Sequence, residues 1–109
     1  MGLAKAKELV FTGRRLSADE ALAMGLVNYV SVDFVAAYEK SLELAKEINK
    51  KGPLGVRWAK EAVNGSLDMG IEDGLLLEER CYGNIVATKD RIEGLKAFVE
   101  KRDPVYKGE

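Results

Sequence analysis

Apolar residues recur every three or four positions along most of this 109-residue chain, in stretches that end at glycine, proline or a capping residue. This spacing places them on one face of a helix, whereas a strand would alternate every second residue. Gly13 is of the type that ends a helix, and Gly52-Pro53 ends one helix and starts the next. The sequence therefore predicts a mainly α chain of six helices.

Capping residues set the expected helix starts. Ser17 and Glu20 have the spacing of a capping box, in which the serine caps the helix and the glutamate reaches back. Asp33 and Thr88 are residue types that cap helices. The expected helices cover about 3–12, 18–24, 34–50, 53–64, 71–86 and 89–102, with a short extended segment at 26–30 and a tail at 105–109.

The chain has no histidine and a single cysteine, Cys81. The missing histidine excludes Ser-His-Asp and Cys-His nucleophilic systems and any histidine-ligated metal. One cysteine excludes an internal disulfide and a cysteine-cluster zinc site. Any chemistry must therefore come from carboxylates, lysines, tyrosines or the backbone, and we expect no metal. We expect Cys81 to be a small buried residue.

Charge and hydropathy narrow the range of partners. Lys plus Arg number 17 and Asp plus Glu number 18, so the net charge is −1. A general binder of nucleic acid is usually clearly basic, so we expect no such partner. The apolar runs are too short to cross a membrane, and residues 1–15 lack the continuous apolar region of a signal peptide.

Four stretches, in chain order, resemble the C-terminal part of the crotonase (enoyl-CoA hydratase/isomerase) superfamily. They are residues 6–14 (AKELVFTGR), 18–21 with 23–27 (AMGLV), 59–64 (AKEAVN) and 88–102 (TKDRIEGLKAFVEKR). Together they span nearly the whole chain. Within the superfamily, the segment around Cys81-Tyr82 and the ending at 100–108 look most like methylglutaconyl-CoA hydratases.

The resemblance implies that residues 1–109 are one C-terminal helical region of a crotonase-like α/β fold, without the N-terminal spiral of ββα turns. In this family, hydration of an enoyl thioester uses backbone N–H groups that hold the enolate and a pair of glutamates for acid–base work. Those groups lie in the spiral. We therefore expect no catalytic residue here and no hydratase activity from this chain alone.

The resemblance also implies what these helices contribute. In the family they pack subunits into trimers or hexamers, and the last helices help to close the CoA pocket. By position, Tyr82, Phe98 and Lys101 match residues that line this pocket. An aromatic face packs on adenine or the pantetheine arm, and a lysine pairs with a phosphate. Coenzyme A enters as part of the substrate, no other cofactor is implied, and the expected setting is the mitochondrial matrix or cytoplasm.

Structural interpretations of the same residues stay open. Lys101 lies in a run of four charged residues, which is more often a solvated face, and Tyr82 and Phe98 are more often core or subunit-interface residues. Adjacent Glu78 and Glu79 point about 100° apart on a helix, so they do not converge on one atom. Two other functions remain: a non-enzymatic helical oligomerisation module and a free-standing CoA binder.

Overall fold

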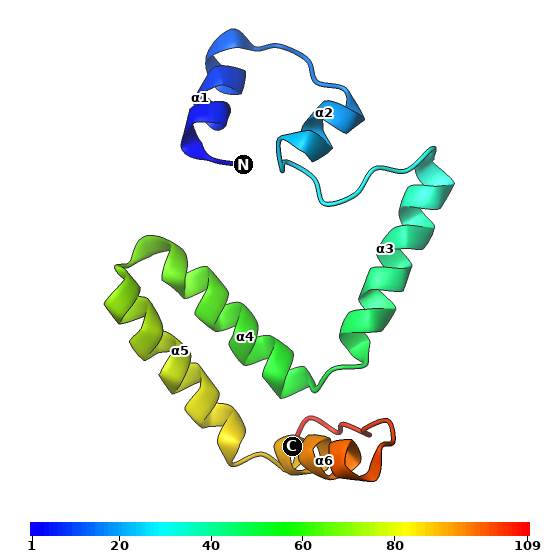
Figure 1. Cartoon of the computed structure of the whole chain (residues 1–109), viewed down its shortest axis with the longest axis vertical. Helices are drawn as coiled ribbons and strands as arrows, with labels where there is room; N and C mark the ends of the chain where they lie inside the picture. The colour runs from blue at the N-terminus through cyan, green and yellow to red at the C-terminus, as the bar shows by residue number, and fades with distance from the viewer. The chain divides into compact units, whose positions relative to one another are not determined.

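A computed structural model describes all residues from Met1 to Glu109 (Figure 1). It contains six α-helices, one 3-10 turn and no strand. The elements are α1 (Leu3–Thr12), α2 (Ala18–Ala23), α3 (Phe34–Asn49), α4 (Pro53–Gly65), η1 (Ser66–Asp68), α5 (Ile71–Val86) and α6 (Lys89–Glu100). The mainly α prediction is confirmed, and every expected helix boundary lies within about two residues of the observed one.

The chain forms two compact units, Met1–Leu42 and Glu43–Glu109, which are described separately. The boundary falls inside α3, whose start is capped by Asp33 as expected, because the Ala36 N–H donates to the Asp33 carboxylate at 2.8 Å. None of the helices combines the length and apolar character needed to span a membrane.

In the first unit, a glycine ends α1 and a capping box starts α2. Gly13 ends α1 in the left-handed conformation with φ 59°, which glycine adopts at little cost. The capping box at Ser17 and Glu20 is present, and the Ser17 backbone N–H lowers the pKa of Glu20. No strand forms over 26–30, the segment predicted to be extended. It is irregular backbone after α2, and the Leu26 N–H donates back to the Ala21 carbonyl at 2.8 Å.

In the second unit, α4 and α5 lie side by side and are joined through η1 (Figure 1). Gly65 at the end of α4 leaves space for Leu77 of α5, because a β-carbon on Gly65 would overlap one methyl group of Leu77. Cys81 faces the interior and is only 4% exposed, which confirms its prediction as a small buried residue. This pair of helices frames the cavities described below.

The C-terminal tail is an ordered part of the second unit. Thr88 caps α6 by accepting a hydrogen bond from the Arg91 N–H at 3.2 Å, as expected. The helix ends at Glu100, two residues earlier than predicted. Residues 103–109 then run back along α6 towards its start, because Val105 pairs with Glu93 and Lys107 pairs with Asp90.

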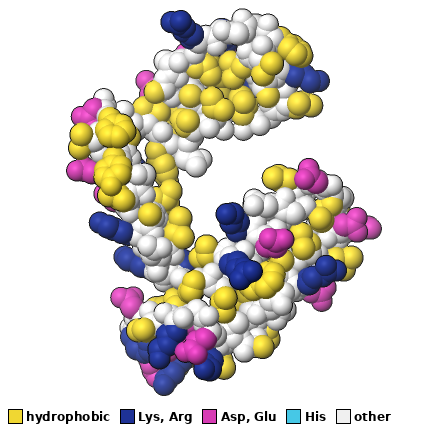
Figure 2. All heavy atoms as spheres, turned by 180° about the vertical axis from the view of Figure 1, so that it is seen from behind, with side chains coloured by type: hydrophobic (Ala, Val, Ile, Leu, Met, Phe, Trp, Pro, Cys, Tyr) yellow, Lys and Arg dark blue, Asp and Glu magenta, His cyan; other side chains and the backbone are white.

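Little apolar surface is buried in either unit. The only buried apolar residues are Ala21, Cys81 and Ala97, and the accessible surface totals 9005 Å². Size scaling gives about 7,200 Å² for two separate compact bodies of these lengths. Apolar side chains accordingly gather at the surface of both units (Figure 2). Exposed patches of this extent mark interaction surfaces.

Candidate functional site

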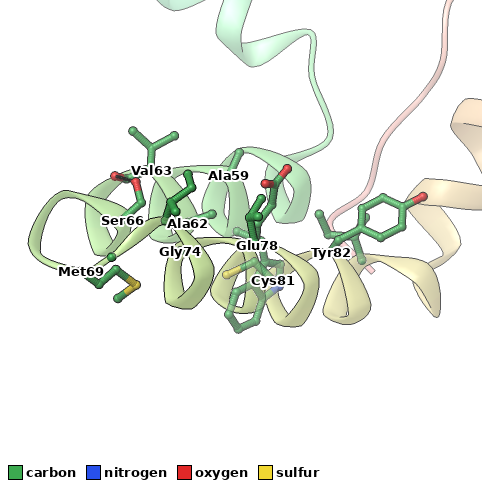
Figure 3. Close-up of a pocket in the computed structure, with 14 residues that line it drawn as sticks. Ala59, Ala62, Val63, Ser66, Met69, Gly74, Glu78, Cys81 and Tyr82 are labelled. Atoms are coloured by element: carbon green, nitrogen blue, oxygen red, sulfur yellow. Dashed lines mark hydrogen bonds between the residues drawn. The ribbon is translucent and has the colours of Figure 1, made fainter.

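A groove of about 690 Å³ runs between α4 and α5 and is called here the α4–α5 groove (Figure 3). Small residues on α4 leave the space, with Ala59 and Ala62 facing Cys81 of α5. Its full lining is Trp58, Ala59, Ala62, Val63, Ser66, Met69, Gly70, Ile71, Gly74, Leu75, Glu78, Cys81, Tyr82 and Ile85. The lining is mostly apolar, which suits a hydrophobic chain or another protein surface better than a charged group.

Ionisable groups are sparse in this groove. Glu78 and Glu79 are both exposed, and only Glu78 belongs to the lining. The two carboxylates therefore do not converge, as the helix geometry predicted. No cluster of three or more metal-ligating side chains forms anywhere in the chain. The groove offers packing rather than acid–base chemistry.

A second groove, of about 480 Å³, lies between the start of α4, the end of α5 and the start of α6, and is called here the Tyr106 groove. Tyr106 of the tail packs against Gly52 and Gly94, and its hydroxyl would lie 3.1 Å from a β-carbon on Gly94. Glycine at these two positions gives the aromatic ring its space. Tyr82 lines both grooves and so marks the point where they meet.

The three residues predicted to contact CoA lie on two elements. Tyr82 on α5 is 57% exposed, and Phe98 on α6 is 83% exposed. Neither is buried within this chain, and their interpretation as core or subunit-interface residues stays a prediction. Lys101 directly follows α6 and is also exposed. The structure places Tyr82 in the grooves, whereas Phe98 and Lys101 lie outside both linings, near the C-terminal end of α6.

Lys101 adopts an uncommon backbone conformation. Its φ is 54° and its ψ is 40°, which is the left-handed region, and it is the only residue other than glycine with a positive φ. The Lys101 N–H donates to the Phe98 carbonyl and the Arg102 N–H to the Ala97 carbonyl. These are the two hydrogen bonds of a Schellman ending, in which glycine is the usual residue.

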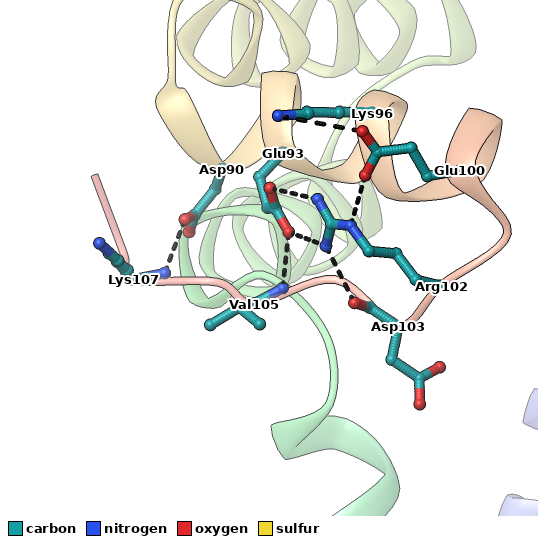
Figure 4. Close-up of polar contacts among 8 residues, drawn as sticks. All are labelled: Asp90, Glu93, Lys96, Glu100, Arg102, Asp103, Val105 and Lys107. Carbon is teal, nitrogen blue, oxygen red and sulfur yellow. Dashed lines mark hydrogen bonds and ion pairs between the residues drawn. The ribbon is translucent and has the colours of Figure 1, made fainter.

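Sequence reasoning missed the polar network beside this turn (Figure 4). Arg102 forms a two-pronged ion pair with Glu93, with N···O distances of 2.6 and 3.0 Å, and its Nε donates to Glu100 at 2.6 Å. Glu93 also accepts the Val105 N–H at 2.9 Å. The Arg102 hydrogen bonds lower the pKa of Glu93 to about 2, and the same bonds raise the pKa of Arg102.

Asp90 holds the end of the tail. Its carboxylate is nearly buried and accepts the Lys107 N–H at 2.7 Å and the Gly108 N–H at 2.9 Å. Its own N–H donates to the Glu109 carbonyl. Asp90 also lies in the first turn of α6, where a negative charge favours the helix dipole. The contact between Asp90 and the tail could not be predicted, because nothing in the local sequence pattern indicates that residues 103–109 turn back along α6.

The sequence model of the enoyl-CoA hydratase/isomerase family matches residues 1–109. The chain belongs to this family. It is 47% identical to rat methylglutaconyl-CoA hydratase, mitochondrial, and 46% identical to the probable enoyl-CoA hydratase 2, mitochondrial, of Arabidopsis thaliana. It covers 36% of each of these relatives, and 100% and 99% of its own residues are matched, respectively.

Solved structures give the same result. An enoyl-CoA hydratase from Bacillus anthracis is 48% identical, with a TM-score of 0.94 over 99% of this chain and 42% of the solved one. The predicted family and the helical crotonase-fold region are therefore confirmed. Because the chain spans well under half the length of these relatives, their activity carries over to it only as a proposal.

Proposed function

We propose that this chain is the helical part of an enoyl-CoA hydratase that adds water to a short or branched enoyl-CoA, with methylglutaconyl-CoA as the first substrate to test. The observation that carries the proposal is the family match over every residue, together with 47% identity to rat methylglutaconyl-CoA hydratase. The role of this part is to supply CoA contacts and oligomer contacts, since no residue here is assigned to catalysis. Coenzyme A is part of the substrate, and no further cofactor is proposed.

Three exposed residues form the proposed CoA contact. The Lys101 ammonium would pair with a phosphate as a compact point charge, and the rings of Tyr82 and Phe98 would pack on adenine or the pantetheine arm. Exposure of both rings supports this role, because the free energy falls when a ligand or a partner covers an apolar ring that was in water.

Calorimetric titration with CoA and with pantetheine, which lacks the phosphates, tests the contact. The wild-type chain should bind CoA weakly but more tightly than pantetheine, and Lys101→Ala should remove that difference. Lys60→Ala is the matched control, because Lys60 is also an exposed lysine at a helix of the second unit. Equal binding of both compounds by the wild-type chain would refute the role of Lys101.

Turnover assays with crotonyl-CoA and methylglutaconyl-CoA test whether these helices supply contacts only and carry no catalytic residue. The 109-residue chain by itself should show no hydration of either compound. Robust turnover by the pure chain would refute the proposal that these helices supply contacts only. The location proposed is the mitochondrial matrix or the cytoplasm, supported by the mitochondrial designation of several relatives.

A second candidate function is a non-enzymatic oligomerisation module. The observation that favours it is the surface of 9005 Å² with many apolar side chains exposed in both units. The expected assembly is a homotrimer or hexamer. Light scattering coupled to size exclusion measures it, and a folded monomer at high concentration that does not bind a full-length relative would exclude it.

A further inference from the structure

Lys101 occupies a backbone conformation that its own side chain disfavours. A left-handed residue places its β-carbon against the following carbonyl, so glycine normally takes this position after a helix. Two backbone bonds close the turn, at 3.3 Å from Lys101 to Phe98 and at an ordinary 3.1 Å from Arg102 to Ala97. Further contacts that restrain the residues beside Lys101 would offset the cost of a side chain in this region.

Arg102, which follows Lys101, forms hydrogen bonds to three other residues. Both terminal nitrogens of the Arg102 guanidinium pair with Glu93, and its Nε pairs with Glu100. Its Nη1 also donates to the Asp103 carbonyl at 3.1 Å. A planar guanidinium bound in this way has little freedom to rotate. Since Arg102 adjoins Lys101, a guanidinium fixed in this way restrains the backbone on the C-terminal side of the turn.

We propose that the Glu93–Arg102 ion pair is a positioning device that holds Lys101 in the left-handed turn and so presents its ammonium to a phosphate of CoA. The proposal rests on the function proposed above, in which Lys101 pairs with a phosphate. Glu93 and Arg102 are positioning residues, because they act on the ligand only through the backbone of Lys101.

Hydrogen exchange at the Lys101 and Arg102 amides tests whether the ion pair holds the backbone of the turn. Glu93→Gln should speed exchange at both amides at least tenfold, while exchange within α5 stays unchanged and shows that the unit is folded. Glu61→Gln is the matched control, because it removes the same charge from an exposed glutamate of α4. Adding Lys101→Gly to Glu93→Gln should slow exchange again, because glycine accepts the turn without the ion pair.

Either of two results would overturn this part: equal exchange in Glu93→Gln and Glu61→Gln, or no recovery in the double variant. If Glu93→Gln disturbs α5 as well, Arg102→Lys replaces it. That variant keeps the positive charge, loses the fork and should give the same local increase in exchange.

Titration with CoA and pantetheine tests the ligand part. Glu93→Gln should reduce the preference for CoA at least threefold although Lys101 is intact. A purely electrostatic role of Glu93 predicts the opposite, since the variant removes a negative charge and should strengthen phosphate binding. An unchanged or increased preference would overturn the positioning role. If the wild-type chain has no preference for CoA, the proposed function fails, and the exchange experiment still decides whether the ion pair holds the turn.

Discussion

Replacing Asp90 with alanine should release the C-terminal tail from α6. The carboxylate is 6% exposed and accepts two backbone N–H groups, from Lys107 and Gly108, at 2.7 and 2.9 Å. A hydrogen bond to a charged group contributes about 1.5 to 3 kcal/mol. Water solvates the released amides, so we take the lower value, about 1.5 kcal/mol, for each of the two bonds. The free energy that holds the tail on α6 should then fall by about 3 kcal/mol. That energy corresponds to an increase of about 100-fold in tail opening.

Amide hydrogen exchange at Lys107 and Gly108 is the direct assay, with exchange in α5 as the internal reference. Asp73→Ala is the matched control, because Asp73 lies in the first turn of α5 and is exposed. The control removes a charge near a helix start without removing a tail contact. Equal exchange of the two tail amides in the Asp90 and Asp73 variants would refute the reasoning.

Four further outcomes are expected. Gly83→Ala should raise the free energy of unfolding by about 0.5 to 1 kcal/mol in denaturant melts, since the site is inside α5 and a β-carbon there meets open space. Lys101→Gly should also stabilise, by about 0.5 to 1 kcal/mol, because relief of about 1 to 2 kcal/mol of left-handed strain exceeds the flexibility cost of glycine. Pairing with Arg102 lowers the pKa of Glu93 from 4.5 to about 2, so the stabilisation by this ion pair is complete above pH 4.5 and disappears as the pH falls towards 2. An acid titration followed by circular dichroism should show this loss of stability between pH 4.5 and about 2 in the wild-type chain and not in Glu93→Gln. The isolated chain should associate, so its melting temperature and light-scattering mass should both depend on concentration.

Most of the helices could be predicted because their start and stop signals are local. The serine and glutamate of the capping box at 17–20, the glycine after α1 and the proline at the start of α4 act through neighbours within four residues. The end of α6 could not be predicted in this way. Its left-handed residue is a lysine rather than glycine, and a contact nine residues back, from Arg102 to Glu93, braces it.

The candidate site was predictable only in part. The match to a family selected Tyr82, Phe98 and Lys101, and no pattern within the chain would have done so. The grooves depend on tertiary approach, such as the packing of Tyr106 on Gly52, which lies about 50 residues earlier in the chain. Periodicity indicates which face of a helix is apolar, but it does not indicate which other segment covers that face.

Two carboxylates hold the tail of the second unit in place. Its interior buries only Cys81 and Ala97 among apolar residues, so apolar burial contributes less than in a compact domain of this size. The tail is instead fixed to α6 by the carboxylates of Asp90 and Glu93. These contacts are local and lie outside the α4–α5 groove, so a surface that covers that groove would add apolar burial without displacing them. Covering the groove should therefore raise the free energy of unfolding while its loss on protonation of Glu93 stays the same, because the added burial touches neither tail contact.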